Sequence, residues 1–218
     1  MQPSQVLTQR HTLALETSSV LRNTYLLLSL TLAFSALTAW FSAAMGLPRP
    51  GLLISLVGCY GLMFLTERNR NSPLGLVFAF GFTGFMGYIL GPLLNLVVAT
   101  QGMELVMTAL GGTAATFLAL SAYVLVTRKD MSFLGGMMMA GFVVLVVMMI
   151  AGFFIHAPAL HLAMSALFIL FSSGAILMQT SAIVHGGERN YISATISLYV
   201  SIYNIFVSLL SLLGMSRD

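Results

Sequence analysis

Apolar runs of roughly the length needed to cross a membrane follow one another along almost the whole sequence. A membrane-spanning helix needs about 17–25 apolar residues to cross a hydrocarbon core of about 30 Å. Seven runs approach or reach this length: Tyr25–Met45, Gly51–Thr66, Leu74–Val98, Leu105–Val126, Phe133–Ile155, Ala159–Gln179 and Ile192–Leu213. A segment in lipid must satisfy its own backbone hydrogen bonds, so continuous apolar runs predict helices. We therefore expect an all-α membrane protein with seven transmembrane helices.

Charged residues are too few to cover a water-soluble surface. Only 7% of the 218 residues are charged and 58% are hydrophobic, whereas soluble domains carry about 25% charged residues. The second run is short, and the third contains Gly91-Pro92, where the missing amide is expected to kink the helix. An alternative with six spans stays open, in which the second run or the polar seventh run enters the membrane without crossing it.

The polar ends of the runs predict a domain organisation and an orientation. Residues 1–22 are polar, so we expect no cleavable signal peptide and a cytoplasmic N-terminal tail, disordered or forming an interfacial helix, before a membrane domain at residues 23–218. Seven basic residues fall on the side of the N-terminus: Arg10, Arg22, Arg68, Arg70, Arg128, Lys129 and Arg189. Only Arg49 and Arg217 fall on the other side. The positive-inside rule therefore places the N-terminus in the cytoplasm and the C-terminus outside it. Since the basic residues serve orientation, they indicate no nucleic-acid partner.

Polar residues form one stripe along the seventh run. The stripe consists of Ser193, Ser197, Ser201, Asn204, Ser208 and Ser211, at steps of 4, 4, 3, 4 and 3. This spacing places them on one face of a helix. Lipid would leave these groups without hydrogen-bond partners, so we expect the seventh helix to lie inside the bundle.

Small residues on two other runs predict close helix packing around the seventh helix. One ridge lies on the third run and one on the fourth: Gly81, Gly84, Gly87 and Gly91, and Thr108, Gly112, Ala115, Ala119 and Ala122. Small ridges let helix backbones approach each other where lipid removes the usual hydrophobic driving force. The bundle interior is therefore expected to be built on backbone proximity and polar contacts.

The sequence offers no pattern typical of catalysis or metal binding. All fifteen charged residues lie outside the run cores, whereas a charge in mid-membrane usually marks an ion or proton path. His156 and His161 are five residues apart and do not share a helical face. We expect no enzyme activity, no metal and no cofactor. For His185–Glu188, a glycine turn with solvated charges is the simplest interpretation and a pH-responsive latch is the alternative.

The segment from Asn190 to Phe206 reads NYISATISLYVSIYNIF. It resembles the closing signature of the Bax inhibitor family of seven-span proteins, which runs roughly Asp-Tyr-Ile and then Leu-Tyr-Leu-Asp-x-x-Asn-Leu-Phe. The matching residues are Tyr191, Ile192, Leu198, Tyr199, Asn204 and Phe206. Further stretches resemble a bacterial branch of this family: LRNTYLLLSLTLAFSA, GLMFLT, GYILGP, SAYVLVTRKDMSFLGG, PALHLA and SSGAIL. The resemblance implies six helices in two layers around a central seventh helix.

Members of the bacterial branch modulate the membrane-anchored AAA protease FtsH. The resemblance therefore implies a non-enzymatic regulator in the bacterial inner membrane that binds and restrains FtsH. The protease, scaffold proteins associated with it and the lipid bilayer are the partners expected on this basis.

The positions of the family's ion site depart from its pattern. Ion-leak members pair an acid near the end of the sixth span with the Asp of the Leu-Tyr-Leu-Asp motif, and these positions hold Gln179 and Ser201 here. Asn190 stands where the family often has Asp. Neither Gln nor Ser supplies the charge that favours calcium. The departure weakens the alternative function, a pH-sensitive calcium or cation leak, and we expect Gln179 and Ser201 to bond across helices and hold the pore closed. A small-molecule transporter is a further alternative.

Overall fold

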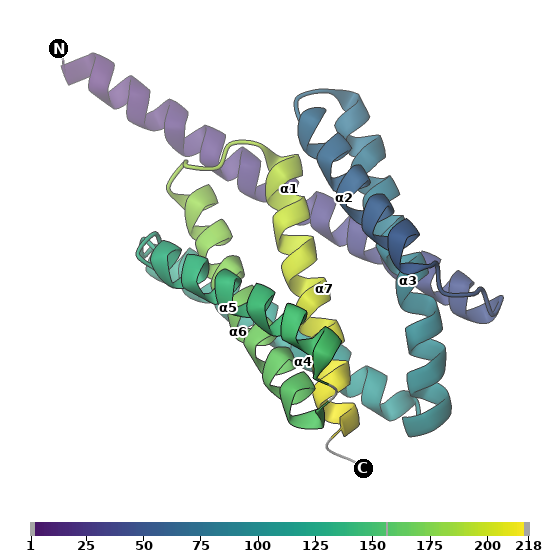
Figure 1. Ribbon diagram of the computed structural model, residues 1–218. Coiled ribbons are helices and arrows are strands. Elements are labelled where there is room, and N and C mark those ends of the chain that lie inside the picture. The colour runs from purple at the N-terminus through teal and green to yellow at the C-terminus, as the bar shows by residue number, and fades with distance from the viewer. Residues whose placement is uncertain (1–2, 156, 216–218) are drawn as a thin grey trace.

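The computed structural model describes residues 3–155 and 157–215, and every regular element within them is an α-helix (Figure 1). The elements in chain order are α1 (Pro3–Ala44), α2 (Leu52–Arg68), α3 (Pro73–Gln101), α4 (Met103–Thr127), α5 (Leu134–Phe154), α6 (Pro158–Val184) and α7 (Tyr191–Met215). His156 and Arg217, which the sequence analysis used, lie outside the described residues. The all-helical prediction is confirmed.

Six of the seven described helices are long and apolar enough to cross a membrane: α1 from Thr17 onwards, α3, α4, α5, α6 and α7. The second apolar run forms α2, which has 17 residues. At about 1.5 Å per residue this helix is about 26 Å long, slightly less than the hydrocarbon core of about 30 Å. The chain is a membrane protein with six candidate spans, and a seventh crossing by α2 stays a prediction.

The first helix is longer than the first apolar run. It has 42 residues and begins at Pro3, so residues 3–22 of the expected tail are helical and continue into the first span without a break. The N-terminal part of α1 projects beyond the neighbouring helices (Figure 1). Residues 1 and 2 of the expected tail lie outside the described residues, and the division at residue 22 stays a prediction.

The last helix lies among the others (Figure 1). It packs against α1, α2, α3, α4 and α6, whereas α5 packs against α6 alone. In the most apolar 18-residue stretch of each helix, 50% of α7 is buried but only 6% of α5. The main core cluster includes Leu198, Tyr199 and Ile205 of α7, packed against buried residues of α1 and α3. The seventh apolar run is therefore an interior helix, and α5 is a peripheral helix facing the membrane.

Gly84, Gly87 and Gly91 of the α3 glycine ridge lie against α1, whereas Gly81 faces Leu62 of α2. A Cβ atom at Gly87 would overlap the carbonyl oxygen of Ser35 and the hydroxyl of Thr38. A Cβ atom at Gly91 would come within 2.8 Å of the Ala39 carbonyl oxygen. Because backbone atoms cannot move aside as a side chain can, these two glycines permit an approach between α1 and α3 that no larger residue allows.

The substitution Gly87→Ala tests this close approach. We expect it to destabilise the bundle by about 1–3 kcal/mol, because the added methyl group forces α1 and α3 apart. Gly111→Ala is the matched control, since a Cβ atom at this α4 position meets no atom within 4 Å. Thermal unfolding of both variants in detergent measures the difference. Equal stability of the two variants would contradict the proposed packing.

Candidate functional site

The turn before α7 is held by the side chain of Asn190. Its Oδ1 accepts the backbone N–H groups of Ile192 at 2.9 Å and Ser193 at 3.2 Å, which caps the start of the helix. Its Nδ2 donates to the Arg70 carbonyl oxygen at 3.0 Å and to Asn71 Oδ1 at 2.8 Å. Aspartate could make the cap but not these two donations. The amide at this position therefore ties α7 to the turn between α2 and α3.

The first serine of the stripe contacts a carboxylate. The Ser193 hydroxyl lies 2.9 Å from Oε2 and 3.1 Å from Oε1 of Glu67, at the end of α2. Arg70 donates to the same carboxylate at 2.5 Å. The Glu67 and Arg70 side chains are 49% and 44% exposed, so this ion pair is a surface contact of small energetic value. The network positions the start of α7 against α2.

The buried centre of α7 is joined to α1 and α3 by Tyr199. Its hydroxyl lies 2.6 Å from Ser35 Oγ and donates to the Thr83 carbonyl oxygen at 3.3 Å. Either hydroxyl can be the donor in the shorter bond. One turn earlier, Thr195 donates to the Thr24 carbonyl oxygen of α1 at 3.2 Å. These bonds connect three helices inside the membrane-spanning region.

The remaining stripe residues have different surroundings. Ser201 and Ser208 are buried, Asn204 and Ser211 are half-buried, and Ser197 is exposed. The Ser201 hydroxyl donates to the Ser197 carbonyl oxygen of its own helix at 2.9 Å. Ser211 accepts from the Ser165 hydroxyl of α6 at 3.1 Å. Described bonds from the stripe to other helices therefore occur near the two ends of α7.

The two family ion-site positions lie on helices that pack together, α6 and α7. Gln179 is five residues before the end of α6, and its Nε2 is buried without a hydrogen-bond partner among the described residues. The one hydrogen bond described for the Ser201 hydroxyl is to its own helix. A bond across helices between these two residues stays a prediction. Of these two side chains, Ser201 has a hydrogen-bond partner and the Gln179 amide nitrogen has none among the described residues.

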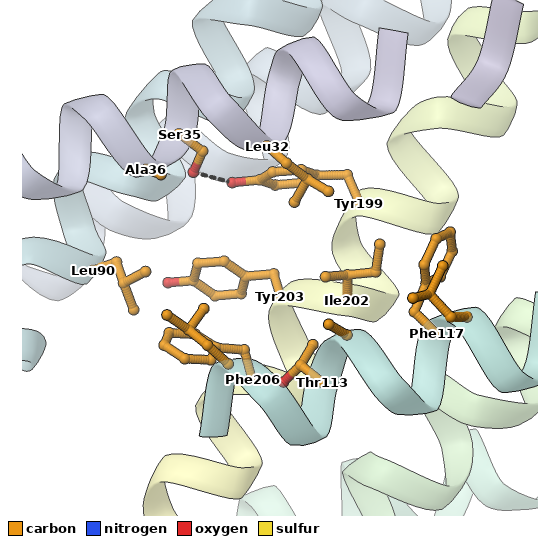
Figure 2. Close-up of a pocket in the computed structure, with 13 residues that line it drawn as sticks. Leu32, Ser35, Ala36, Leu90, Thr113, Phe117, Tyr199, Ile202, Tyr203 and Phe206 are labelled. Atoms are coloured by element: carbon orange, nitrogen blue, oxygen red, sulfur yellow. Dashed lines mark hydrogen bonds between the residues drawn. The ribbon is translucent and has the colours of Figure 1, made fainter. Parts of the chain in front are cut away.

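A cavity of about 440 Å³ lies beside Tyr199, between α1, α3, α4 and α7 (Figure 2). Most of its wall is aliphatic or aromatic, as with Leu32, Phe117 and Phe206. Figure 2 shows the Tyr199 hydroxyl turned toward Ser35 and the Tyr203 hydroxyl pointing toward Leu90. No charged residue is among the described residues that line it. A wall of this kind favours apolar groups over ions.

No cluster of metal-binding side chains emerges in the part of the chain that the structure describes. No group of three His, Cys, Asp or Glu residues there could hold a metal ion. Cys59 is half-buried, with its Sγ 3.4 Å from the Met86 sulfur. The described residues form contacts between helices, an apolar cavity and charged networks at the helix ends.

Sequence reasoning missed the partners of Tyr199. The motif match named Tyr199 but gave it no structural role. A signal for its partner was present on the first apolar run, where Thr31, Ser35, Thr38 and Ser42 follow at steps of 4, 3 and 4. This is the same helical spacing that revealed the stripe on the last run. A polar face on the first run indicates that this helix packs against other helices, and in the structure Ser35 meets Tyr199 of α7 while Ser42 donates to the Tyr88 carbonyl oxygen of α3.

The variant Tyr199→Phe tests the central bond. We expect it to lower stability by about 0.5–2 kcal/mol, because the Ser35 hydroxyl and the Thr83 carbonyl lose their partner. Ser35→Ala in the Tyr199→Phe background should add little, since the shared bond is already absent. Tyr203→Phe is the control, as it removes a hydroxyl that points into the cavity. Unfolding in detergent measures the wild type, Tyr199→Phe, Ser35→Ala, the double variant and Tyr203→Phe, and additive losses at Tyr199 and Ser35 would refute the coupling.

Comparison with known proteins agrees with the motif match. A family profile described as "Inhibitor of apoptosis-promoting Bax1" matches residues 17–218. The protein "Modulator of FtsH protease YccA" of Escherichia coli K12 is 64% identical over 205 residues, 94% of each chain. A second Escherichia coli relative, with the same identity and coverage, is named "Inner membrane protein YccA". An uncharacterised Pseudomonas aeruginosa protein is 57% identical over 202 residues, 92% of this chain and 91% of the relative. The chain belongs to the Bax inhibitor family.

Proposed function

We propose that this protein is a non-enzymatic regulator of the bacterial inner membrane that binds and restrains the membrane protease FtsH. The observation that carries the proposal is the 64% identity, over 94% of both chains, to a relative named as a modulator of this protease. The inner-membrane location rests on the second relative's name and on the six candidate spans. A regulator acts by binding its target, and the described helices offer surfaces through which such binding can occur.

The arrangement proposed for this regulator keeps the expected topology. The N-terminus lies in the cytoplasm and the C-terminus in the periplasm, with the other helices in two layers around α7. The distribution of basic residues supports the orientation. The contacts of α7 with five other helices support the central position.

The N-terminal part of α1 is the segment we propose for the contact with the protease. In this orientation it extends into the cytoplasm, and it is a helical continuation of a membrane span. Figure 1 shows it projecting away from the other helices. A helix that continues from the bundle holds a partner at a set position, which a flexible tail does not. FtsH-associated scaffold proteins are further proposed partners.

Deletion of residues 3–14 tests this contact. These residues precede Thr17, where the first candidate span begins, so the bundle should keep its thermal stability. The full chain should lengthen the half-life of a membrane substrate of FtsH in reconstituted vesicles, and the deletion variant should return it to the value without regulator. A chain with residues 3–14 in scrambled order separates sequence from length.

Two results would contradict the proposal. If the full chain leaves substrate half-life unchanged, restraint of the protease is wrong. If the full chain and the deletion variant restrain the protease equally, the N-terminal part of α1 is not the contact.

A second candidate function is a cation leak, which family membership and the unpartnered Gln179 amide favour. The neutral residues at positions 179 and 201 argue that the native chain does not conduct calcium, because no carboxylate replaces the ion's hydration shell. Restoring the acids should then restore a site on the same helices.

Calcium flux into vesicles tests the leak. We expect native protein to be silent on either side of neutral pH, and the double variant Gln179→Asp, Ser201→Asp to conduct in a pH-dependent manner, because neighbouring carboxylates titrate together. The double variant Gln179→Asn, Ser201→Asn is the neutral control. Flux through the native protein would make the leak the primary function, and a silent Asp variant would remove these positions from any ion path.

A further inference from the structure

A second cavity lies where α4 and α6 end, beside α1. Its volume is about 610 Å³, and the residues lining it come from three parts of the chain. Arg128 follows α4, His185 and Arg189 follow α6, and Thr17 and Ser18 lie on the facing wall of α1. No acidic residue is among the described residues that line it. The cavity therefore gathers basic side chains from segments far apart in sequence.

His185 bridges the ends of α4 and α6. Its Nδ1 lies 2.9 Å from the Ser181 carbonyl oxygen and its Nε2 lies 3.1 Å from the Arg128 carbonyl oxygen. Nδ1 also lies 3.3 Å from the Ser181 hydroxyl, so His185 joins the end of α6 to the residue that follows α4.

The neighbouring acids are bonded elsewhere. Asp130 accepts the Ser132 backbone N–H at 2.9 Å, and this bond, with the nearby His185, lowers the pKa of the carboxyl. Glu188 accepts the Asn190 backbone N–H at 2.8 Å. Neither acid is among the described cavity-lining residues. The charged residues in the described lining are therefore the arginines Arg128 and Arg189, with the two carboxylates outside it.

The backbone of Arg128 is unusual. It has a φ of 50° and is the one residue other than glycine with a positive φ in the described part of the chain. A helix commonly ends with glycine in this conformation, because a Cβ atom is strained there. A long basic side chain at a glycine-favouring position motivates a functional interpretation. Arg128 lines the cavity from this position.

We propose that this cavity binds the phosphate group of an anionic phospholipid. Guanidinium groups pair with phosphate oxygens through charge-assisted and often bidentate hydrogen bonds, which Arg128 and Arg189 can provide. Leu21, Leu125 and Val184 complete an apolar part of the wall. This part suits the glycerol and acyl portion of a lipid, which free phosphate lacks. The site requires only that these helix ends lie at a membrane surface, so it goes beyond the regulation of a protease.

Native mass spectrometry of the full chain tests the site. The protein in detergent is equilibrated with phosphatidylglycerol and phosphatidylcholine of equal chain length, and the dissociation constant for each is measured. Arg128→Gly with Arg189→Ala should weaken phosphatidylglycerol binding about tenfold or more and leave phosphatidylcholine unchanged. Glycine at position 128 also relieves the backbone strain, so this variant should fold.

The matched control is Arg68→Ala with Lys129→Ala. It removes the same net charge from exposed residues on the same side of the bundle, neither of which is among the described cavity-lining residues. We expect the control to retain phosphatidylglycerol. Equal loss in both double variants would mean unspecific attraction and would overturn the site, as would no loss in either.

Two further measurements complete the test. Arg189→Ala alone leaves the α4 end intact and should give an intermediate loss of phosphatidylglycerol binding. This single variant replaces the double variant if thermal unfolding shows that the double variant is unstable. Titration with inorganic phosphate separates the two sources of the ligand. We expect millimolar phosphate not to displace the lipid, and displacement would assign the site to free phosphate and refute the lipid proposal.

Discussion

Water is absent from the hydrocarbon core, so partners within the protein stabilise the polar groups there, and this constraint favours an interior position for α7. The Tyr199 hydroxyl of α7 bonds to Ser35 of α1 and to the Thr83 carbonyl oxygen of α3. Those two helices approach closely because Gly87 faces the backbone of α1. The small residues of α3 and the polar residues of α7 are therefore parts of one arrangement, in which close backbones place hydrogen-bond acceptors within reach of a buried side chain.

The helix ends at the membrane surface follow a different rule, because water and charge are available there. Asn190 caps α7 and holds the turn between α2 and α3 through the same side chain. His185 bridges the last carbonyls of α4 and α6. Such contacts fix the relative positions of helices through loops that are short, so the bundle presents two well-defined polar networks on one side. The candidate contacts with a protease and with lipid headgroups both lie on this side.

The sequence predicted the helices well, because membrane spans leave a strong signal in length and apolarity. It predicted the interior position of α7 from the stripe, although Ser197 is exposed and Ser201 bonds to its own helix. Periodicity indicates which residues share a helix face, but it does not indicate how much of that face the neighbouring helices bury. Tyr199 lies outside the stripe, and its partners Ser35 and Thr83 lie more than a hundred residues away in sequence.

Taken alone, the sequence determined an all-helical membrane protein, its family and an interior last helix, and it placed the neutral residues Gln179 and Ser201 at the positions that the resemblance assigns to an ion site. These follow from local composition and spacing, which each segment carries by itself. The tertiary structure decided that Asn190 and Tyr199 join α7 to its neighbours, and that Arg128, His185 and Arg189 line one cavity with α1. Contacts of this kind depend on how separate helices are rotated and offset against each other, which is set by packing across the whole bundle.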